Sequence, residues 1–313
     1  MKLVFAALLA FAAGDAAARD FAFVTAQVAD AVTIVDLDTM TPVETIVVGG
    51  KPAGVSVAQA SGKVYVTGPD GKTLTVIDAA TRKVEKNIAL EGGPLGIATF
   101  PGQPLVFVAD WYQHRILALD AVAGKIEYRI ATGKSPSGLA ITPDGKWLLS
   151  ADRDDDQVSV INLGARTAAT TVKTGTRPFG VTISRDGRFA YTANVKSNDV
   201  TVIDLSAMAV TATIPVGDRP YAVALARGLG FVTNQYAGTL SVFDIATNKV
   251  TATIAVDDYP EGIEASADGR FVYVACWDSN TLLKVDTTTL QVVGSAETAD
   301  GPRAFGNFIW SAP

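Results

Sequence analysis

Apolar and polar positions alternate along this chain in short runs, and helical periodicity is almost absent. Alternation with a period of two is typical of strands that bury one face. Between residues 177 and 216, the Asp186-Gly187 pair is a tight-turn signal, and polar loops separate the later runs. The pattern predicts a unit of four short β-strands, at residues 178–184, 188–193, 200–204 and 210–216.

This unit recurs seven times, at a spacing of 42 residues, or 40 in one case. The second strand of each unit contains a residue that opens a motif of the YVT or FVA type, namely Phe23, Tyr65, Phe107, Leu149, Tyr191, Phe231 and Tyr273. An acidic or amide column follows thirteen residues later, at Asp36, Asp78, Asp120, Asn162, Asp204, Asp244 and Asp286. A proline column completes the repeat, at Pro52, Pro94, Pro136, Pro178, Pro220, Pro260 and Pro302. Periods in the forties indicate one supersecondary unit per repeat. The sequence therefore predicts an all-β fold, a seven-bladed β-propeller of four-stranded blades.

The two ends of the repeat region predict how the ring closes. The chain after residue 18 begins with a second-strand motif at residues 21–25 and ends with a first-strand motif at residues 302–310. We expect the N- and C-terminal strands to pair in one blade, which removes free sheet edges. Small residues two positions after each proline should lie on the crowded innermost strands, at Gly54, Gly96, Gly138, Gly180, Ala222, Gly262 and Ala304.

Three segments carry a resemblance to a known family: Tyr65-Val-Thr-Gly68, Tyr191-Thr-Ala-Asn194 and Phe231-Val-Thr-Asn234. Each precedes a Val-x-Val-Ile-Asp type strand and then a Val-Gly-x-x-Pro type loop. The chain resembles the YVTN family of β-propeller repeats over residues 21–310, and most of all its exported YncE-like members. The resemblance implies a seven-bladed propeller in the periplasm or on the cell surface. It implies little about chemistry, because the repeat motif is structural and most members lack an established activity.

The N-terminal segment predicts export. Residues 1–18 have the form of a secretory signal, with Lys2 before an apolar run at residues 3–13 and small residues for cleavage near Ala18. The run is too short to span a bilayer, so we expect no membrane span. Residues 19–313 should form a single propeller domain that is periplasmic or secreted and monomeric.

Charge and cysteine content narrow the function further. The net charge of −6 disfavours non-specific nucleic-acid binding, which depends on neutralising phosphates. Cys276 is the only cysteine, so no disulfide can form within the chain. Its thiol is either a buried filler or a reactive group beside Trp277.

Positions that differ between repeats offer the candidate site. The loops that lead into the innermost strands and the loops between second and third strands should share one face of the ring. On that face, Lys134, Arg153, Lys196 and the aromatic residues Phe179 and Tyr236 accompany the residues that we expect to bind a ligand or partner. Those residues are Lys51, Trp111, Tyr112, His114, Arg177, Arg219, Tyr259, Trp277 and Arg303. Cations beside aromatic rings suit an anionic or aromatic small ligand, and they suit a protein partner equally well.

Catalysis is the competing interpretation. His114 is the only histidine, so a three-histidine zinc site is impossible, and no Gly-x-Ser-x-Gly elbow presents a serine to it. The run Asp152–Asp156 lacks the glycine and distal glutamate of a calcium loop. We therefore assign no catalytic residue, metal or cofactor, and we predict a non-enzymatic binding platform. The alternative is a lactonase-like hydrolase, or an accessory subunit of a cofactor-linked dehydrogenase that uses the same mouth.

Overall fold

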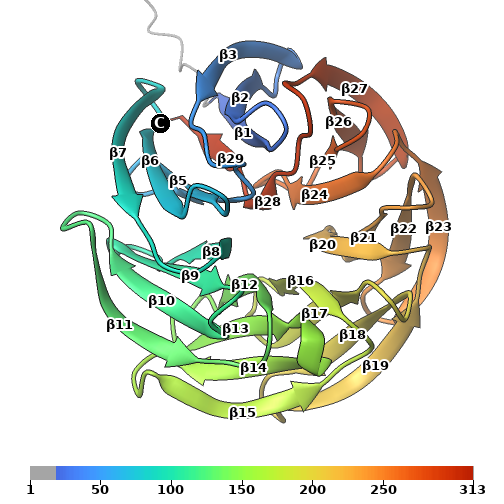
Figure 1. Cartoon of the computed structure of the whole chain (residues 1–313). Coiled ribbons are helices and arrows are strands. Elements are labelled where there is room, and N and C mark those ends of the chain that lie inside the picture. The colour runs from blue at the N-terminus through green and yellow to red at the C-terminus, as the bar shows by residue number, and fades with distance from the viewer. Residues whose placement is uncertain (1–18, 313) are drawn as a thin grey trace, which may run out of the picture.

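The computed structural model describes residues 19–312, which form strands β1–β29 and one short 3-10 helix, η1 (Arg153–Asp155). The strands build seven sheets arranged around one axis (Figure 1). This confirms the predicted all-β, seven-bladed propeller. The predicted signal at residues 1–18 lies outside the described residues. Within residues 19–312, no helix has the length and apolar character that a membrane span requires.

Each blade is numbered in chain order, and its strands run from the axis outwards. Blade 1 contains β29 (Ile309–Ser311), β1 (Asp20–Ala26), β2 (Ala31–Asp36) and β3 (Thr41–Val47). Blade 2 contains β4 (Gly54–Ala58), β5 (Lys63–Gly68), β6 (Thr73–Asp78) and β7 (Lys83–Ala89), with β28 (Phe305–Asn307) added at its inner edge. Blade 3 contains β8 (Pro94–Thr99), β9 (Leu105–Asp110), β10 (Arg115–Asp120) and β11 (Lys125–Ala131). Blade 4 contains β12 (Pro136–Ile141), β13 (Trp147–Asp152), β14 (Gln157–Asn162) and β15 (Thr167–Lys173).

The remaining blades follow the same order. Blade 5 contains β16 (Pro178–Ile183), β17 (Phe189–Asn194), β18 (Asp199–Asp204) and β19 (Ala209–Pro215). Blade 6 contains β20 (Pro220–Ala226), β21 (Leu229–Asn234), β22 (Thr239–Asp244) and β23 (Lys249–Ala255). Blade 7 contains β24 (Pro260–Ala265), β25 (Phe271–Cys276), β26 (Thr281–Asp286) and β27 (Gln291–Glu297). Because strands that are consecutive in the chain run antiparallel within each blade, loops alternate between two faces of the ring. The upper face carries the inter-blade loops and the loops between second and third strands, and the lower face carries the others.

The ring closes as predicted, through a strand from each end of the chain. β29 pairs antiparallel with β1, with Trp310 opposite Phe21. Just before it, β28 pairs in parallel with β4 of blade 2. Figure 1 shows the red C-terminal strands beside the blue N-terminal ones. The predicted single innermost strand is therefore divided in two, and its halves bind neighbouring blades.

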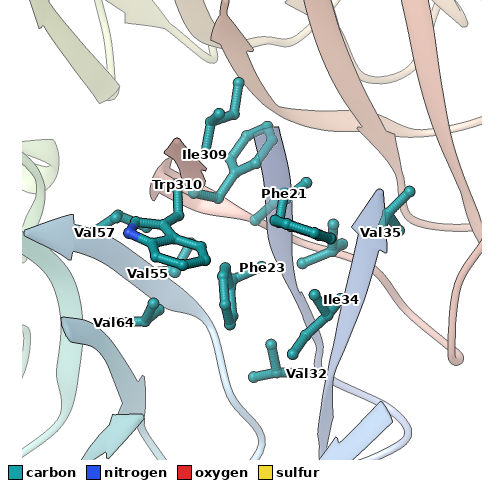
Figure 2. Packing of buried hydrophobic residues seen from close by; sticks show 14 of the residues in the cluster. Phe21, Phe23, Val32, Ile34, Val35, Val55, Val57, Val64, Ile309 and Trp310 are labelled. Atoms are coloured by element: carbon teal, nitrogen blue, oxygen red, sulfur yellow. The ribbon is translucent and has the colours of Figure 1, made fainter. Parts of the chain in front are cut away.

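The seam between blades 1 and 2 is packed with apolar side chains. Trp310 is buried and stacks on Phe21, with ring centroids 6.1 Å apart. Figure 2 shows Phe23 of blade 1 and Val55 and Val64 of blade 2 around the same indole. Burial of an aromatic side chain of this size is among the largest single contributions to a core. The closing strand is therefore held by packing as well as by backbone hydrogen bonds.

The two repeated columns have local structural roles. In all seven repeats the acidic or amide side chain accepts backbone N–H groups of the turn that follows, as Asp204 does from Ser206 and Ala207. The Ser206 hydroxyl also donates to Asp204 and helps to lower its pKa to about 2. The small column has a more specific cause than crowding at the axis. A Cβ atom added at Gly180 would lie 2.6 Å from the carbonyl oxygen of Tyr221 in the next blade.

Candidate functional site

The upper face is held together by hydrogen bonds that recur from blade to blade. In five repeats, one of these bonds links two neighbouring loops. The side chain at the end of the loop between the second and third strands accepts a backbone N–H from the residue directly before the proline of the next inter-blade loop. These bonds join Asp30 to Lys51, His114 to Ser135, Asp156 to Arg177, Asn198 to Arg219, and Asn280 to Gly301. The lone histidine, expected to bind a ligand, thus has a structural partner, because its Nδ1 accepts the Ser135 N–H at 3.1 Å.

The four candidate residues that directly precede a proline of the repeat share an unusual backbone conformation. Lys51, Arg177, Arg219 and Tyr259 have φ values of 54°, 60°, 56° and 55°. This left-handed region is unfavourable for residues with a Cβ atom, and it occurs most often where the surrounding structure requires it. The backbone N–H groups of Lys51, Arg177 and Arg219 donate the hydrogen bonds described above, and these bonds hold the three residues in this conformation. Their side chains therefore project from loops of fixed shape.

Several predicted cations on this face are already paired within the molecule. Lys51 Nζ lies 2.8 Å from Asp30, and Lys134 Nζ lies 3.6 Å from Asp155. Arg153 pairs with Asp154 and also stacks over the Trp111 ring at 5.5 Å. Within residues 19–312, Arg177, Lys196 and Arg219 have no carboxylate within 4.0 Å. The face is thus less positive than the residue list alone indicates.

Arg303 lies at the centre of a buried polar network. Its Nε is 3.0 Å from Glu261, it donates to the Tyr221 hydroxyl, and its second guanidinium nitrogen donates to Gln27 at 3.1 Å. Gln235 donates to the other oxygen of Glu261 at 2.6 Å. Burial raises the pKa of the Glu261 carboxyl, and the nearby Arg303 guanidinium opposes that rise. The network joins four blades at the axis. Gln27 comes from blade 1, Tyr221 and Gln235 come from blade 6, and Glu261 comes from blade 7. Arg303 directly precedes β28, which lies on blade 2.

Three aromatic rings close the upper end of the axis. Phe179, Tyr221 and Phe305 are buried, and their ring centroids lie 4.4 to 5.7 Å apart. Trp111 packs against Phe179 from blade 3, at 6.4 Å. We name Phe179, Tyr221, Phe305 and Trp111 the aromatic plug, so the predicted residue Trp111 is part of it. The upper face is closed at its centre and does not lead into the ring.

Two exposed tyrosines and a partly buried tryptophan form a second aromatic group, on blades 6 and 7. Tyr236 and Tyr259 lie 5.4 Å apart, and Tyr259 and Trp277 lie 6.4 Å apart. Tyr236 is 53% exposed and Tyr259 is 37% exposed. The Arg219 guanidinium lies 4.3 Å above the Tyr236 ring and donates to its hydroxyl. We name Tyr236, Tyr259 and Trp277 the aromatic arc. It brings together three predicted residues, namely Arg219, Tyr259 and Trp277.

The other candidates lie apart from the arc. Tyr112 is 69% exposed on blade 3, and Arg177 is exposed on blade 5. Lys51 is engaged with Asp30, and Arg303 lies beneath the surface in the polar network. The nine predicted residues thus divide among the plug, the network, the arc and isolated positions on the upper face.

A large cavity opens on the lower face. It has a volume of about 1240 Å³, and its walls are the innermost strands and the loops that follow them. None of the nine candidate residues is among its lining residues. Glu264 borders it, and the Glu264 carboxylate accepts the backbone N–H groups of Phe308 and Ile309. Burial raises the pKa of Glu264 to about 8, against the effect of those two hydrogen bonds. The acid in this cavity is therefore used to hold the closing strand.

The acidic run at residues 152–156 and Cys276 were two further candidates from the sequence, and both are held within the protein. Asp152 is buried and accepts hydrogen bonds from Gly133, Ser150 and Ser159, while Asp155 accepts one from Lys134. Cys276 is fully buried, and burial raises the pKa of its thiol to about 12. Within residues 19–312, no group of three His, Cys, Asp or Glu side chains is placed to hold a metal ion.

Glu261, Tyr221 and Gln235 were not among the site residues predicted from the sequence. The sequence did contain a pattern that points to Tyr221 and Glu261. The residues directly after the seven repeated prolines are Ala, Leu, Ser, Phe, Tyr, Glu and Arg in chain order. Tyr221, Glu261 and Arg303 are consecutive in that column, so they stand on adjacent blades. Opposite charges at one column position of neighbouring blades predict an ion pair across the seam.

Comparison with known families settles what kind of propeller this is. The model of the YncE-like β-propellers matches residues 2–105 and 106–266. The chain belongs to the YncE-like β-propeller family. This confirms the resemblance drawn from the repeat motifs. None of the curated proteins compared with this YncE-like chain matches it.

Solved structures support the fold. A hydrazine synthase chain from Kuenenia stuttgartiensis is 19% identical, with a TM-score of 0.72 over 82% of this chain and 89% of that one. A functionally unknown protein from Desulfotomaculum acetoxidans is 16% identical, with a TM-score of 0.79 over 93% of this chain and 98% of that one. At these identities the likeness concerns the fold alone.

Proposed function

We propose that this YncE-like propeller is a rigid platform that binds a protein partner on its upper face. The aromatic arc carries the proposal, because it exposes two tyrosines beside a partly buried tryptophan on loops of fixed shape. Tyrosine, tryptophan and arginine supply most of the binding energy at protein interfaces. Arg219 lies against the same arc. These side chains match the composition of an interface centre.

The closed axis favours a macromolecular partner over a small ligand. Small-ligand sites are concave and enclose most of the ligand surface. On the upper face, Phe179, Tyr221 and Phe305 fill the position where such a pocket would form. The paired state of Lys51 and Arg303 also reduces the charge available to an anionic ligand.

The ionisable side chains also favour binding over acid–base catalysis, because their polar atoms are already engaged within the protein. His114 accepts a backbone N–H, and Glu261 is engaged by Arg303 and Gln235. A general base must reach the proton that it removes. His114 instead holds a loop between blades 3 and 4, and Glu261 holds the buried polar network beside the arc, which supports the platform over the hydrolase alternative.

Fixed loops would favour tight binding. A partner loses less conformational freedom on binding when the surface it meets is already ordered. The hydrogen bonds at Arg219 and Gly301 tie loops on both sides of the arc. The predicted signal at residues 1–18 would place this platform in the periplasm or outside the cell.

Site-specific photocrosslinking in the native host tests the proposal. A photoreactive phenylalanine analogue replaces Tyr236 in one variant, and it replaces Val122 on the lower face in the control. We expect a discrete adduct from position 236 that is absent from position 122, with the partner identified by mass spectrometry. The purified partner should bind the Tyr259→Ala variant roughly tenfold more weakly than the unaltered protein. Adducts that are equal at both positions would contradict the proposal.

A further inference from the structure

We infer that the partner presents a basic segment, rich in arginine or lysine, to the aromatic arc. This inference rests on the proposed function and adds the chemistry of the partner. The loops around the arc belong to blades 6 and 7 and to the segment that leads into blade 1. They carry five aspartates, Asp218, Asp257, Asp258, Asp278 and Asp300.

These carboxylates are free of basic partners inside the molecule. Within residues 19–312, none of the five lies within 4.0 Å of a lysine, arginine or histidine nitrogen. On the same loops, Arg219 stacks on Tyr236, and Arg303 is paired with Glu261. Elsewhere on this face, Asp30, Asp154 and Asp155 have a lysine or arginine beside them. The charge around the arc is therefore negative on balance, with five aspartates against the Arg219 guanidinium.

Three of the aspartates lie on or beside the loops that carry the aromatic rings. Asp258 approaches the loop of Tyr236, since a Cβ atom added at Gly238 would be 3.8 Å from its Oδ1. Asp278 directly follows Trp277 in the chain. Trp277 packs against Gly301, the neighbour of Asp300. A side chain that reached the arc would meet a ring and a carboxylate together.

This combination of groups suits a cation, and a guanidinium best of all. A guanidinium stacks on an aromatic face while its edge donates to a carboxylate. The protein makes the first of these contacts itself, with Arg219 over Tyr236. On blade 5 the charge reverses, because Arg177 and Lys196 have no carboxylate nearby within the described residues. A basic segment would therefore be directed toward blades 6 and 7.

Fluorescence anisotropy with a labelled hexa-arginine peptide tests the inference, and a labelled hexa-glutamate peptide reports the opposite charge. The test variant combines Asp258→Asn, Asp278→Asn and Asp300→Asn, and asparagine keeps an oxygen acceptor at each position. The control variant combines Glu44→Gln, Asp70→Asn and Glu127→Gln, which are exposed carboxylates away from the arc. Both variants change the net charge by the same amount. Thermal melts of both establish that they fold.

We expect hexa-arginine to bind the unaltered protein, and hexa-glutamate not to bind. The test variant should bind hexa-arginine roughly tenfold more weakly, and the control variant within about twofold of the unaltered protein. Tyr259→Leu should also weaken binding, since simple charge attraction would not involve a ring. Equal weakening in the two triple variants, or no binding to the unaltered protein, would overturn the inference. A partner crosslinked at position 236 would still support the platform in that case. If hexa-arginine binds but no partner crosslinks there, the proposed function fails instead.

Discussion

The Glu264 carboxylate of blade 7 accepts the backbone N–H of Ile309, in the strand that closes blade 1, at 2.7 Å. It also accepts the N–H of Phe308, at the break between β28 and β29. From the other side, the Gln59 side chain donates to the carbonyl oxygen of Ile309 at 2.6 Å. Side chains from blades 7 and 2 therefore hold the junction at which the ring is completed.

Glu264 makes the stability of the ring depend on pH. Burial raises its pKa to about 8, from an ordinary value of 4.5. Between these values the folded protein binds a proton that the unfolded chain has released, so stability falls as pH rises through this range. Glu264→Gln keeps an oxygen acceptor and removes the titration. We expect its melting temperature to gain on that of the unaltered protein between about pH 5 and about pH 9.

Glu44→Gln is the matched control, because Glu44 is an exposed carboxyl on β3. Calorimetric melts across the pH range should show no such gain for it. A constant difference between Glu264→Gln and the unaltered protein at every pH would show that Glu264 does not titrate between these values.

Removal of the closing strands should destabilise the whole ring. Deletion of residues 303–313 removes β28 and β29 and exposes the inner edges of blades 1 and 2. Trp310→Ala is a milder change that should cost about 3–5 kcal/mol, because the indole is buried in the seam. Urea denaturation measures both, with Val293→Ala on an exposed part of β27 as the control. A truncated protein that melts within a few degrees of the full chain would show that closure is dispensable.

The fold could be predicted because its determinants recur. Each aspartate such as Asp204 and each small residue such as Gly180 performs a local task that is repeated in other blades. A period in the sequence therefore reports a period in space. The division of the last strand into β28 and β29 was not predictable, because it depends on a contact with Glu264 from another blade.

The candidate site was harder to predict, since it depends on contacts between blades. The loops on the upper face were correctly grouped, and Arg219, Tyr259 and Trp277 do gather at the arc. The charge of that face was not apparent from the loops alone. Whether Arg303 is free or paired depends on Glu261, which lies 42 residues away in the chain and 3.0 Å away in space.

The left-handed backbone at Arg177 leads to a prediction about stability. Its φ is 60°, and glycine adopts this conformation without the Cβ penalty. Arg177→Gly should therefore raise the free energy of unfolding by up to about 1 kcal/mol, since the gain exceeds the extra freedom of the unfolded chain. Arg177→Val should lower it, because a β-branched residue tolerates this region poorly.

The control for this comparison is Lys249→Gly, at the exposed start of β23, where φ is not positive. It should lower stability by about 0.5–1 kcal/mol. Denaturant titration of the three variants gives the comparison. If Arg177→Gly proved as destabilising as Lys249→Gly, the Arg177 side chain would be contributing contacts that outweigh its backbone strain.

The Glu261–Arg303 pair should behave as a coupled unit. Arg303→Ala leaves a buried carboxylate without its cation, and loss of one partner of a buried pair typically costs about 3–5 kcal/mol. Glu261→Leu combined with Arg303→Met replaces both charges by apolar groups of similar size, so it should recover most of that loss. A double-mutant cycle from chemical denaturation measures the coupling. Because Gln235 donates to Glu261 and neighbours Tyr236, the apolar pair should also weaken partner binding at the arc while leaving the ring folded. Additive single effects would mean that Glu261 and Arg303 stabilise the axis independently.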